Sequence, residues 1–289
     1  LRAGAGEWPR GRPGGRAPPA GGRAPRPRFT PFPLLGPPGA VRGLALGIDA
    51  APALDATPAG FDAGEPLPLE LEDQYRRSEE PFAGPEEFSA VAWANWTPEA
   101  LYVAVEVRKA APWFRSGDAP PLRLDNESDD IHSDGLQIYV GEREGRGFAG
   151  YLVVPAGDGG LRVRAAGGDA VPDAVRGKWR AMAEGYRVTL GIPWPAWARP
   201  HAGGEVGFDL LVNEMYGDRE RRAGQLVWSG GNGGGSLRGD SPTPERPGVL
   251  ELVGGAGGGA PRRPAPGTAW TWVAPGQHTR RGDVRPRGP

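Results

Sequence analysis

Apolar and polar residues alternate along most of the middle of the chain. In residues 101–107, Leu101, Val103, Val105 and Val107 occupy every second position. A period of two places successive side chains on opposite faces of a β-strand, so this segment is predicted to be a strand with one apolar face. The same pattern recurs in residues 136–140, 152–154, 161–163, 186–192 and 206–212. Further candidate strands are residues 87–94, 179–183, 225–229 and 249–253.

Many short strands with little helix predict an all-β fold, either a sandwich or a barrel. Glu184-Gly185, between two alternating runs, indicates a hairpin turn in which Gly supplies a positive φ. A helical turn or two is expected only near residues 195–199. Alternation in nearly every strand favours antiparallel sheets with one packed face and one solvent-exposed face.

Composition divides the chain of 289 residues into three parts. Its 49 Gly and 34 Pro residues concentrate in residues 1–40 and 254–289. Such Gly/Pro/Arg-rich segments bury too little apolar surface to order themselves, so both ends are predicted to be disordered. The predicted folded domain is residues 41–253.

Charge and cysteine content exclude several classes of function. The 34 Lys and Arg residues nearly balance the 35 Asp and Glu residues, and a nucleic-acid-binding protein would usually be basic. The chain has no cysteine, which excludes disulfides and thiolate metal sites. No apolar stretch reaches the roughly 20 residues that span a bilayer. No signal peptide is visible, but the first residue is Leu1, so this absence carries no weight.

The order of the predicted strands carries a resemblance to a known family. The segments that carry it are Leu101–Val107, Asp134–Val140, Gly185–Trp194, Val206–Asn213, Trp228-Ser229 and Gly248–Leu252. Together they resemble the family 9 carbohydrate-binding modules and the wider DOMON-like sandwich group, over roughly residues 60–253. The resemblance implies a two-sheet antiparallel β-sandwich, jelly-roll-like, that binds sugar ends of polysaccharides without catalysis.

Only some of the family's sugar-binding residues have counterparts in this sequence. The resemblance implies a sugar site between two tryptophans, but their positions correspond to Ile131 and to a segment, residues 230–237, that has no aromatic residue. The sugar-binding glutamate corresponds to Gln137, whereas Asn213 matches a family asparagine. Gln137 and Asn213 are therefore candidate carbohydrate-binding residues. Trp113, in a Pro-rich loop, is a candidate replacement for the stacking platform, because an indole ring offers an apolar face to a sugar.

The densest group of carboxylates lies just before the strand at residues 136–140. Asp125, Asp129 and Asp130 are candidate ligands for Ca²⁺, which prefers hard oxygen ligands, and the resemblance also implies structural calcium. The spacing fails the EF-hand pattern, and a solvated acidic loop explains the same residues.

Catalysis has little support in the sequence. The three histidines, His132, His201 and His278, belong to no recognisable catalytic motif. Some DOMON relatives hold haem between histidine and methionine, but no haem is expected here. The resemblance further implies an extracellular or periplasmic location and a catalytic domain elsewhere in a longer parent protein.

Three hypotheses remain open. The chain is a carbohydrate-binding module, or a DOMON-like sandwich that has lost sugar binding and serves structure or protein interaction, or, with the weakest support, a catalytic or haem-bearing domain.

Overall fold

The computed structural model describes residues 41–61, 63–77, 80–122, 128–142, 147–230 and 248–254. The segments predicted to be disordered, residues 1–40 and 254–289, lie outside these ranges apart from Gly254, so the predicted domain boundaries stay predictions.

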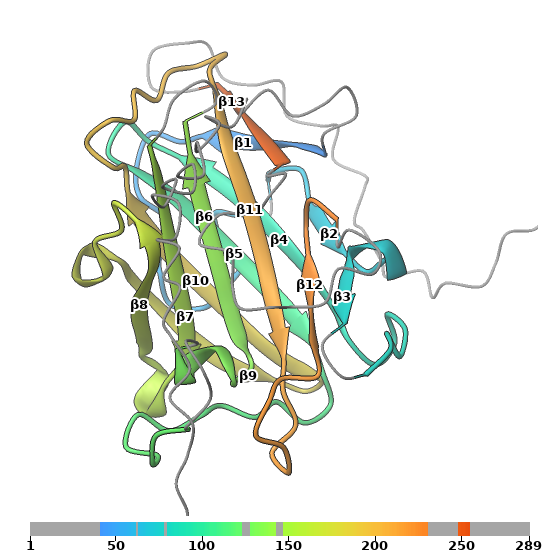
Figure 1. Ribbon diagram of the computed structural model, residues 1–289. Coiled ribbons are helices and arrows are strands. Elements are labelled where there is room, and N and C mark those ends of the chain that lie inside the picture. Colours follow the sequence, from blue (N-terminus) through green and yellow to red (C-terminus); the bar gives the residue numbers. More distant parts are fainter. Residues whose placement is uncertain are drawn as a thin grey trace, which may run out of the picture. The chain divides into compact units, whose positions relative to one another are not determined.

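The described residues form strands and almost no helix, which confirms the all-β prediction (Figure 1). The strands are β1 (Arg42–Gly47), β2 (Leu67–Leu69), β3 (Tyr75–Arg77), β4 (Ser89–Trp96), β5 (Ala100–Arg108), β6 (Gly135–Gly141), β7 (Phe148–Pro155), β8 (Leu161–Gly168), β9 (Arg176–Met182), β10 (Gly185–Pro193), β11 (Glu205–Glu214), β12 (Gly224–Val227) and β13 (Gly248–Val253). The short 3-10 helices are η1 (Glu72–Gln74), η2 (Asp129–Ile131), η3 (Gly157–Gly159) and η4 (Pro172–Ala174). Within the described ranges, no helix has the length and apolar character needed to cross a membrane.

Each predicted strand is present, but β1, β2 and β3 were not predicted. The helical turns expected at residues 195–199 are wrong, because this segment forms a single turn closed by the Ala198 N–H and the Pro195 carbonyl at 2.9 Å. The predicted hairpin turn is confirmed between β9 and β10, where Gly185 pairs with Met182 and has a φ of 144°. A Cβ atom at Gly185 would lie 1.9 Å from the Val107 carbonyl oxygen, so no other residue fits there.

Hydrogen bonds join the strands into one mixed sheet with the main order β8-β7-β6-β11-β13-β1-β4-β5-β10-β9. The prediction of purely antiparallel pairing is wrong at β1, which runs parallel to both β13 and β4. The period of two could not show this, because parallel and antiparallel neighbours both leave side chains alternating between two faces. The two-sheet, jelly-roll-like arrangement stays a prediction.

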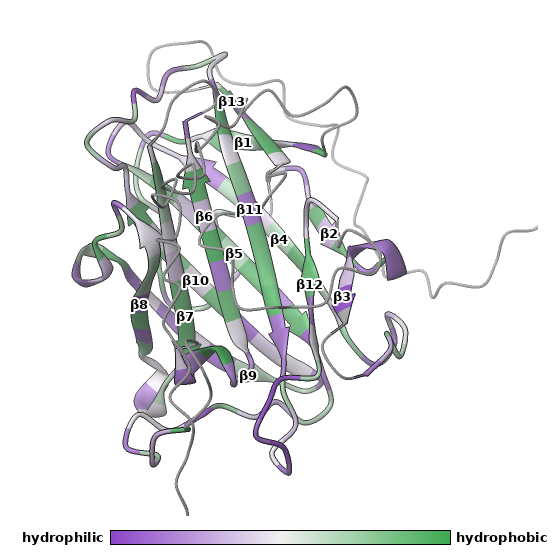
Figure 2. Cartoon of the chain, viewed as in Figure 1, coloured by the Kyte–Doolittle hydropathy of each residue, from purple (hydrophilic) through white to green (hydrophobic). Residues whose placement is uncertain are grey.

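One apolar cluster forms the main core, and its members come from strands distant in sequence. It contains Val105 of β5, Leu190 of β10, Ile138 of β6 and Leu210 of β11, each fully buried. In Figure 1, β6 and β11 lie in front of β5 and β10, and the cluster fills the space between them. Figure 2 shows apolar and polar residues alternating along β6, whereas an apolar stretch, Leu210–Val212, interrupts the alternation along β11. Below, the face of each strand that points away from this core is called its outer face.

A buried ion pair joins three segments at one end of β6. The Asp134 carboxylate accepts hydrogen bonds from Lys109 Nζ at 2.7 and 2.8 Å, from the Trp113 N–H at 2.6 Å and from the Met215 N–H at 2.9 Å. Lys109 Nζ also donates to the Met215 carbonyl and lies 4.8 Å from the centre of the Tyr216 ring. Burial raises the pKa of Asp134 to about 6, although the Lys109 charge acts in the opposite direction. The pair fixes the chain after β5 against the start of β6 and the end of β11.

A second buried carboxylate lies on the outer face of β11. Asp209 accepts hydrogen bonds from the Ser229 N–H at 3.1 Å, from the Leu210 N–H at 3.0 Å and from the Ser229 hydroxyl. Burial raises the pKa of Asp209 from 3.8 to about 7, against the effect of these hydrogen bonds. Because the folded-state pKa is raised, the stability that this group contributes is present below about pH 4 and is lost as the pH rises through about 7.

We predict that Lys109→Met lowers the free energy of unfolding at neutral pH by about 3–5 kcal/mol, because it leaves the Asp134 charge buried without its partner. Urea denaturation measures the loss. The double variant Lys109→Met with Asp134→Asn is the control: it has no buried charge, and the single Asn oxygen keeps one of the two backbone hydrogen bonds, so it should recover part of the loss. A single variant as stable as the wild type would contradict the structural role of the pair.

We predict that Asp209→Asn removes part of the pH dependence of stability. The variant should gain stability relative to the wild type as the pH rises from about 4 to about 8, by on the order of a few kcal/mol, since one pKa unit corresponds to about 1.4 kcal/mol. Asp134 titrates in the same direction but is present in both proteins, so the difference isolates Asp209. A stability difference that stays constant over this pH range would refute the assignment.

Candidate functional site

The two predicted carbohydrate-binding residues lie together on the outer faces of β6 and β11. In the antiparallel pairing, Gln137 lies opposite Leu211 and Asn213 lies opposite Gly135. Gln137 Nε2 donates to Asn213 Oδ1 at 3.0 Å, and the Tyr139 hydroxyl donates to Gln137 Oε1 at 2.9 Å. The Asn213 amide donates onward to the Ile131 carbonyl at 3.3 Å. Two residues 76 positions apart are therefore linked side chain to side chain.

Gln225 of β12 extends this pair to a third amide. It lies opposite Asn213 in the pairing of β11 with β12, so both side chains share one face. Gln225 is fully buried, and neither its Nε2 nor its Oε1 has a hydrogen-bond partner among the residues that the structure describes. A buried amide without partners costs roughly 1–3 kcal/mol per unsatisfied group. Gln137, Asn213 and Gln225 are called the amide row below.

Sequence reasoning missed Gln225, although residues 225–229 were a candidate strand. Its type and position gave a weak signal: a Gln at the start of a strand otherwise occupied by Leu226 and Val227. What distinguishes it is the missing partner, and this property exists only once β3, β11 and β12 are assembled.

The predicted solvent-exposed face is wrong for β6, β11 and β12. Every residue of β12 is buried, as is nearly every residue of β6 and β11, whereas β9 keeps exposed and half-buried positions in alternation. Tyr139, Leu211 and Val227 form a separate apolar cluster on the outer face. The contact between Asn213 and Ile131 also places η2 over the amide row. The alternation of apolar and polar residues shows which residues are polar, but it cannot show whether a polar residue is covered by other parts of the chain or exposed to solvent.

Asp130, a predicted calcium ligand, forms ion pairs with two arginines of β8. Its carboxylate contacts Arg162 at 2.8 Å and also pairs with Arg164 Nε. Burial favours the neutral form of Asp130, but the two guanidinium groups outweigh it, and the pKa is lowered. These contacts hold η2 against β8. In the strand register, Arg164 of β8 lies opposite Leu152 of β7, which in turn lies opposite Gln137 of β6.

The other predicted calcium ligands are less engaged. Asp129 accepts a hydrogen bond from the Leu122 N–H at 3.1 Å and lies 3.7 Å from Arg115, whereas Asp125 lies outside the described residues. No group of three or more carboxylate or histidine side chains that could hold a metal occurs in the described ranges. Calcium binding stays a prediction.

Trp113 is half-buried at the end of β6 where the ion pair lies. Its backbone is held twice by Asp134: the Trp113 N–H donates to the Asp134 carboxylate, and its carbonyl accepts from the Asp134 N–H at 3.0 Å. Its ring lies against Gly217, where an added Cβ atom would come within 2.6 Å of the indole. A glycine at 217 therefore allows the ring to approach the loop after β11 closely, at the same end of β11 as Asn213.

Comparisons with known proteins show the fold. No protein-family model matches the sequence, and no curated protein matches it. Among solved structures, a family 9 carbohydrate-binding module from Caldicellulosiruptor kristjanssonii in complex with cellotriose is 19% identical, with a TM-score of 0.51 over 77% of this chain and 100% of the other. The glucose complex of such a module from the same organism gives 19% identity and a TM-score of 0.52 over 76% of this chain and 100% of the other. The chain therefore has the fold of the family 9 carbohydrate-binding modules.

Proposed function

We propose that this chain is a non-catalytic carbohydrate-binding module whose amide row forms hydrogen bonds with sugar hydroxyls. The observation that carries the proposal is Gln225, a fully buried amide whose donor and acceptor find no partner in the described part of the chain. It lies beside Asn213 and Gln137, the two residues that the family resemblance implied independently. The similar fold of modules solved with glucose and cellotriose supports the ligand class.

Amides suit the recognition of sugars because their hydrogen-bonding groups match those of vicinal hydroxyls. Each amide offers two donors and one carbonyl acceptor, and each hydroxyl both donates and accepts. A sugar that bonds to Gln225 removes the cost of its unsatisfied groups, which favours binding. The amides are neutral, and neutral hydrogen bonds are weaker than those of a carboxylate, so the expected affinity is weak, about 1 mM.

Access to the amide row requires a change in the protein. Gln137, Asn213 and Gln225 have almost no exposed surface, so a sugar reaches them only when the chain over the outer face moves aside. This displacement costs free energy that binding must supply. It is a second reason to expect weak binding.

Trp113 is proposed as the stacking platform. Its half-buried ring lies on Gly217, and its backbone is fixed by Asp134, so the ring loses little freedom when a sugar stacks on it. The nearby Tyr216, 38% exposed, offers a second aromatic surface that sequence reasoning did not identify.

The proposed role is binding without catalysis. Two carboxylates of this region are already engaged, Asp130 with two arginines and Asp209 with Ser229 and the backbone. Glycoside hydrolysis depends on a pair of carboxyl groups that act on the substrate, and carboxylates held in this way do not suit that role. By analogy with the family, we further propose an extracellular or periplasmic location and a catalytic domain elsewhere in a longer parent protein.

The burial of the amide row supports a second candidate function. A sandwich that has lost sugar binding and serves structure or protein interaction would also keep these amides covered. The two functions differ in what is expected of Gln225: its amide should bind sugar in a carbohydrate-binding module but not in a structural or protein-interaction domain.

We predict that Gln225→Leu abolishes sugar binding without lowering stability. The Gln225 amide makes no hydrogen bond to any described residue, so its removal breaks none of the bonds in that part of the fold, whereas a sugar loses a donor and an acceptor. Calorimetric titration of the full chain with glucose and cellotriose measures binding, and thermal melting measures stability. Undiminished binding in Gln225→Leu would exclude the amide row as the site, and absence of binding in the wild type would favour the interaction domain.

We predict that Trp113→Ala weakens cellotriose binding by about tenfold, because aromatic stacking contributes about 1 kcal/mol or more in a shallow site. Trp197→Ala is the matched control. Trp197 is also half-buried over a glycine, Gly147, but this glycine lies next to β7, at the other end of β6. Equal losses in the two variants would show a general effect on folding and would remove Trp113 from the site.

We propose that the acidic segment with Asp125, Asp129 and Asp130 binds Ca²⁺, and we predict that added Ca²⁺ raises the melting temperature, since an ion that binds only the folded state stabilises it. Asp129→Asn should reduce this rise, while Asp158→Asn, an exposed carboxylate in η3, should not. Identical melting curves with Ca²⁺ and with chelator would mean that the segment is a solvated acidic loop.

A further inference from the structure

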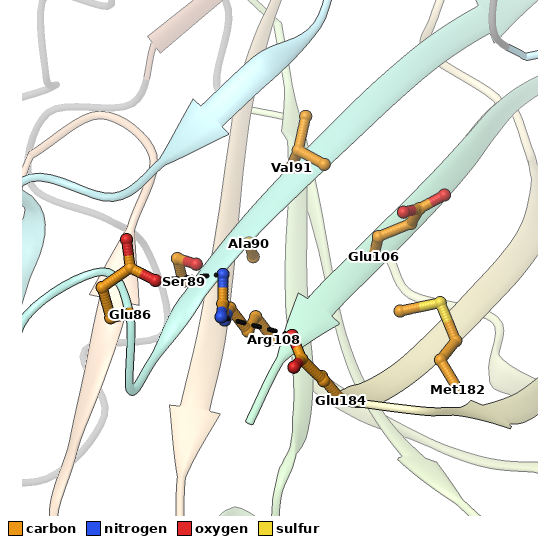
Figure 3. A pocket seen from close by; sticks show the side chains of 8 residues that line it. All are labelled: Glu86, Ser89, Ala90, Val91, Glu106, Arg108, Met182 and Glu184. Carbon is orange, nitrogen blue, oxygen red and sulfur yellow. Dashed lines mark ion pairs between the residues drawn. The ribbon is translucent and has the colours of Figure 1, made fainter. Parts of the chain in front are cut away.

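A pocket of about 400 Å³ lies beside β4, β5, β9 and β10, which carry none of the amide row. It is lined by Glu86, Ser89, Ala90, Val91, Glu106, Arg108, Met182 and Glu184. These residues come from the start of β4, the end of β5 and the β9–β10 hairpin, as Figure 3 shows. Pockets that hold small molecules usually measure about 300–1,000 Å³.

Strand register explains the hollow. Ser89 pairs with Arg108, Arg108 pairs with Gly185, and Gly185 pairs with Met182. The glycine that the hairpin requires has no side chain, so this row has an empty position between Arg108 and Met182. The next row carries Val91 and Glu106. The pocket therefore results from the same backbone constraint that fixes the hairpin.

Carboxylates outnumber cations around the pocket. Arg108 is shared between Glu86 and Glu184, each at 3.2 Å, and Figure 3 shows its guanidinium between them. Arg187 pairs with Glu106, and both of its contacts, at 2.8 and 2.6 Å, reach Oε1. Among these five side chains, three carboxylates and two guanidinium groups leave one negative charge, which one cation would balance; the next cation in the strand register, Arg180 opposite Arg187, is exposed to solvent.

Ser89 supplies an observation independent of charge. Its side chain is 2% exposed and lines the pocket, and within the described part of the chain its buried hydroxyl oxygen has no hydrogen-bond partner. An unpaired buried hydroxyl is costly, and a donor inside the pocket would satisfy it. Met182, Val91 and Ala90 add an apolar wall.

We propose that this pocket binds a small organic cation, a primary ammonium group on a short aliphatic stem. The ammonium has three donors and no acceptor, which matches Ser89 Oγ and the Glu106 carboxylate. The stem packs on Met182 and Val91. The site is independent of the proposed sugar site, because it lies on β4, β5, β9 and β10 rather than on β6, β11 and β12.

The test is a titration of the full chain with n-butylamine, with 1-butanol as the uncharged analogue of the same size. We expect saturable binding of n-butylamine that weakens as salt rises, and at least tenfold weaker binding of 1-butanol. Nα-acetyl-lysine amide should occupy the same pocket. If it binds more tightly than n-butylamine, the ligand class is a lysine side chain; if it binds more weakly, the ligand class is a free amine. Equal binding of n-butylamine and 1-butanol, or no saturable binding of either amine, would overturn the proposal.

Variants locate the binding. Ser89→Ala removes a hydroxyl that bonds to none of the described residues, so the protein should remain folded, and n-butylamine binding should weaken several-fold. Glu106→Gln should weaken it by about tenfold or more, because hydrogen bonds to charged groups are the stronger ones. Glu251→Gln on β13 is the matched control and should bind as the wild type does. A loss in Glu251→Gln equal to that in Glu106→Gln, or unchanged binding in Ser89→Ala, would place the amine elsewhere.

Discussion

The buried pair of Lys109 and Asp134 is the constraint on which the candidate sugar site depends. The Asp134 carboxylate is fully buried, and it accepts from one side chain and from two backbone N–H groups of separate segments. A charge in this position needs all of its partners, because a buried carboxylate without compensation is far costlier than a surface one. Each partner is therefore fixed in place. The position of Trp113, the entry into β6 and the exit from β11 all follow from this one group.

The buried polar residues on the outer face differ in whether their hydrogen-bonding groups are used, and this difference is the basis of the proposed sugar site. Gln137 donates to Asn213, Asn213 donates to the Ile131 carbonyl, and Tyr139 donates to the Gln137 carbonyl, so this part of the row is ordered without a ligand. Gln225 is the next residue of the row, and its amide bonds to none of the described residues. A fold that keeps one unsatisfied group beside two satisfied ones has both a rigid frame and a place where a ligand gains hydrogen bonds.

The sequence predicted the positions of most strands well but the contacts of individual side chains poorly, for a physical reason. Alternation located β5, β6, β10 and β11 because one packed face imposes a period of two, but β2 spans only Leu67–Leu69 and is too short to show one. The family resemblance named Gln137 and Asn213, which the structure places in contact. It could not show that Asp130 pairs with β8 or that Gln225 lacks a partner, because both depend on residues brought together only by folding.

The most direct test of the central claim is the side-chain amide signal of Gln225 in a nitrogen–proton correlation spectrum, followed as cellotriose is added to the full chain. The account predicts a saturable shift of the Gln225 NH₂ resonances at millimolar sugar concentration, about 1 mM or above. Smaller shifts should occur at Gln137 and Asn213, whose amides already have partners. Unchanged Gln225 resonances while other parts of the protein respond to the sugar would contradict it.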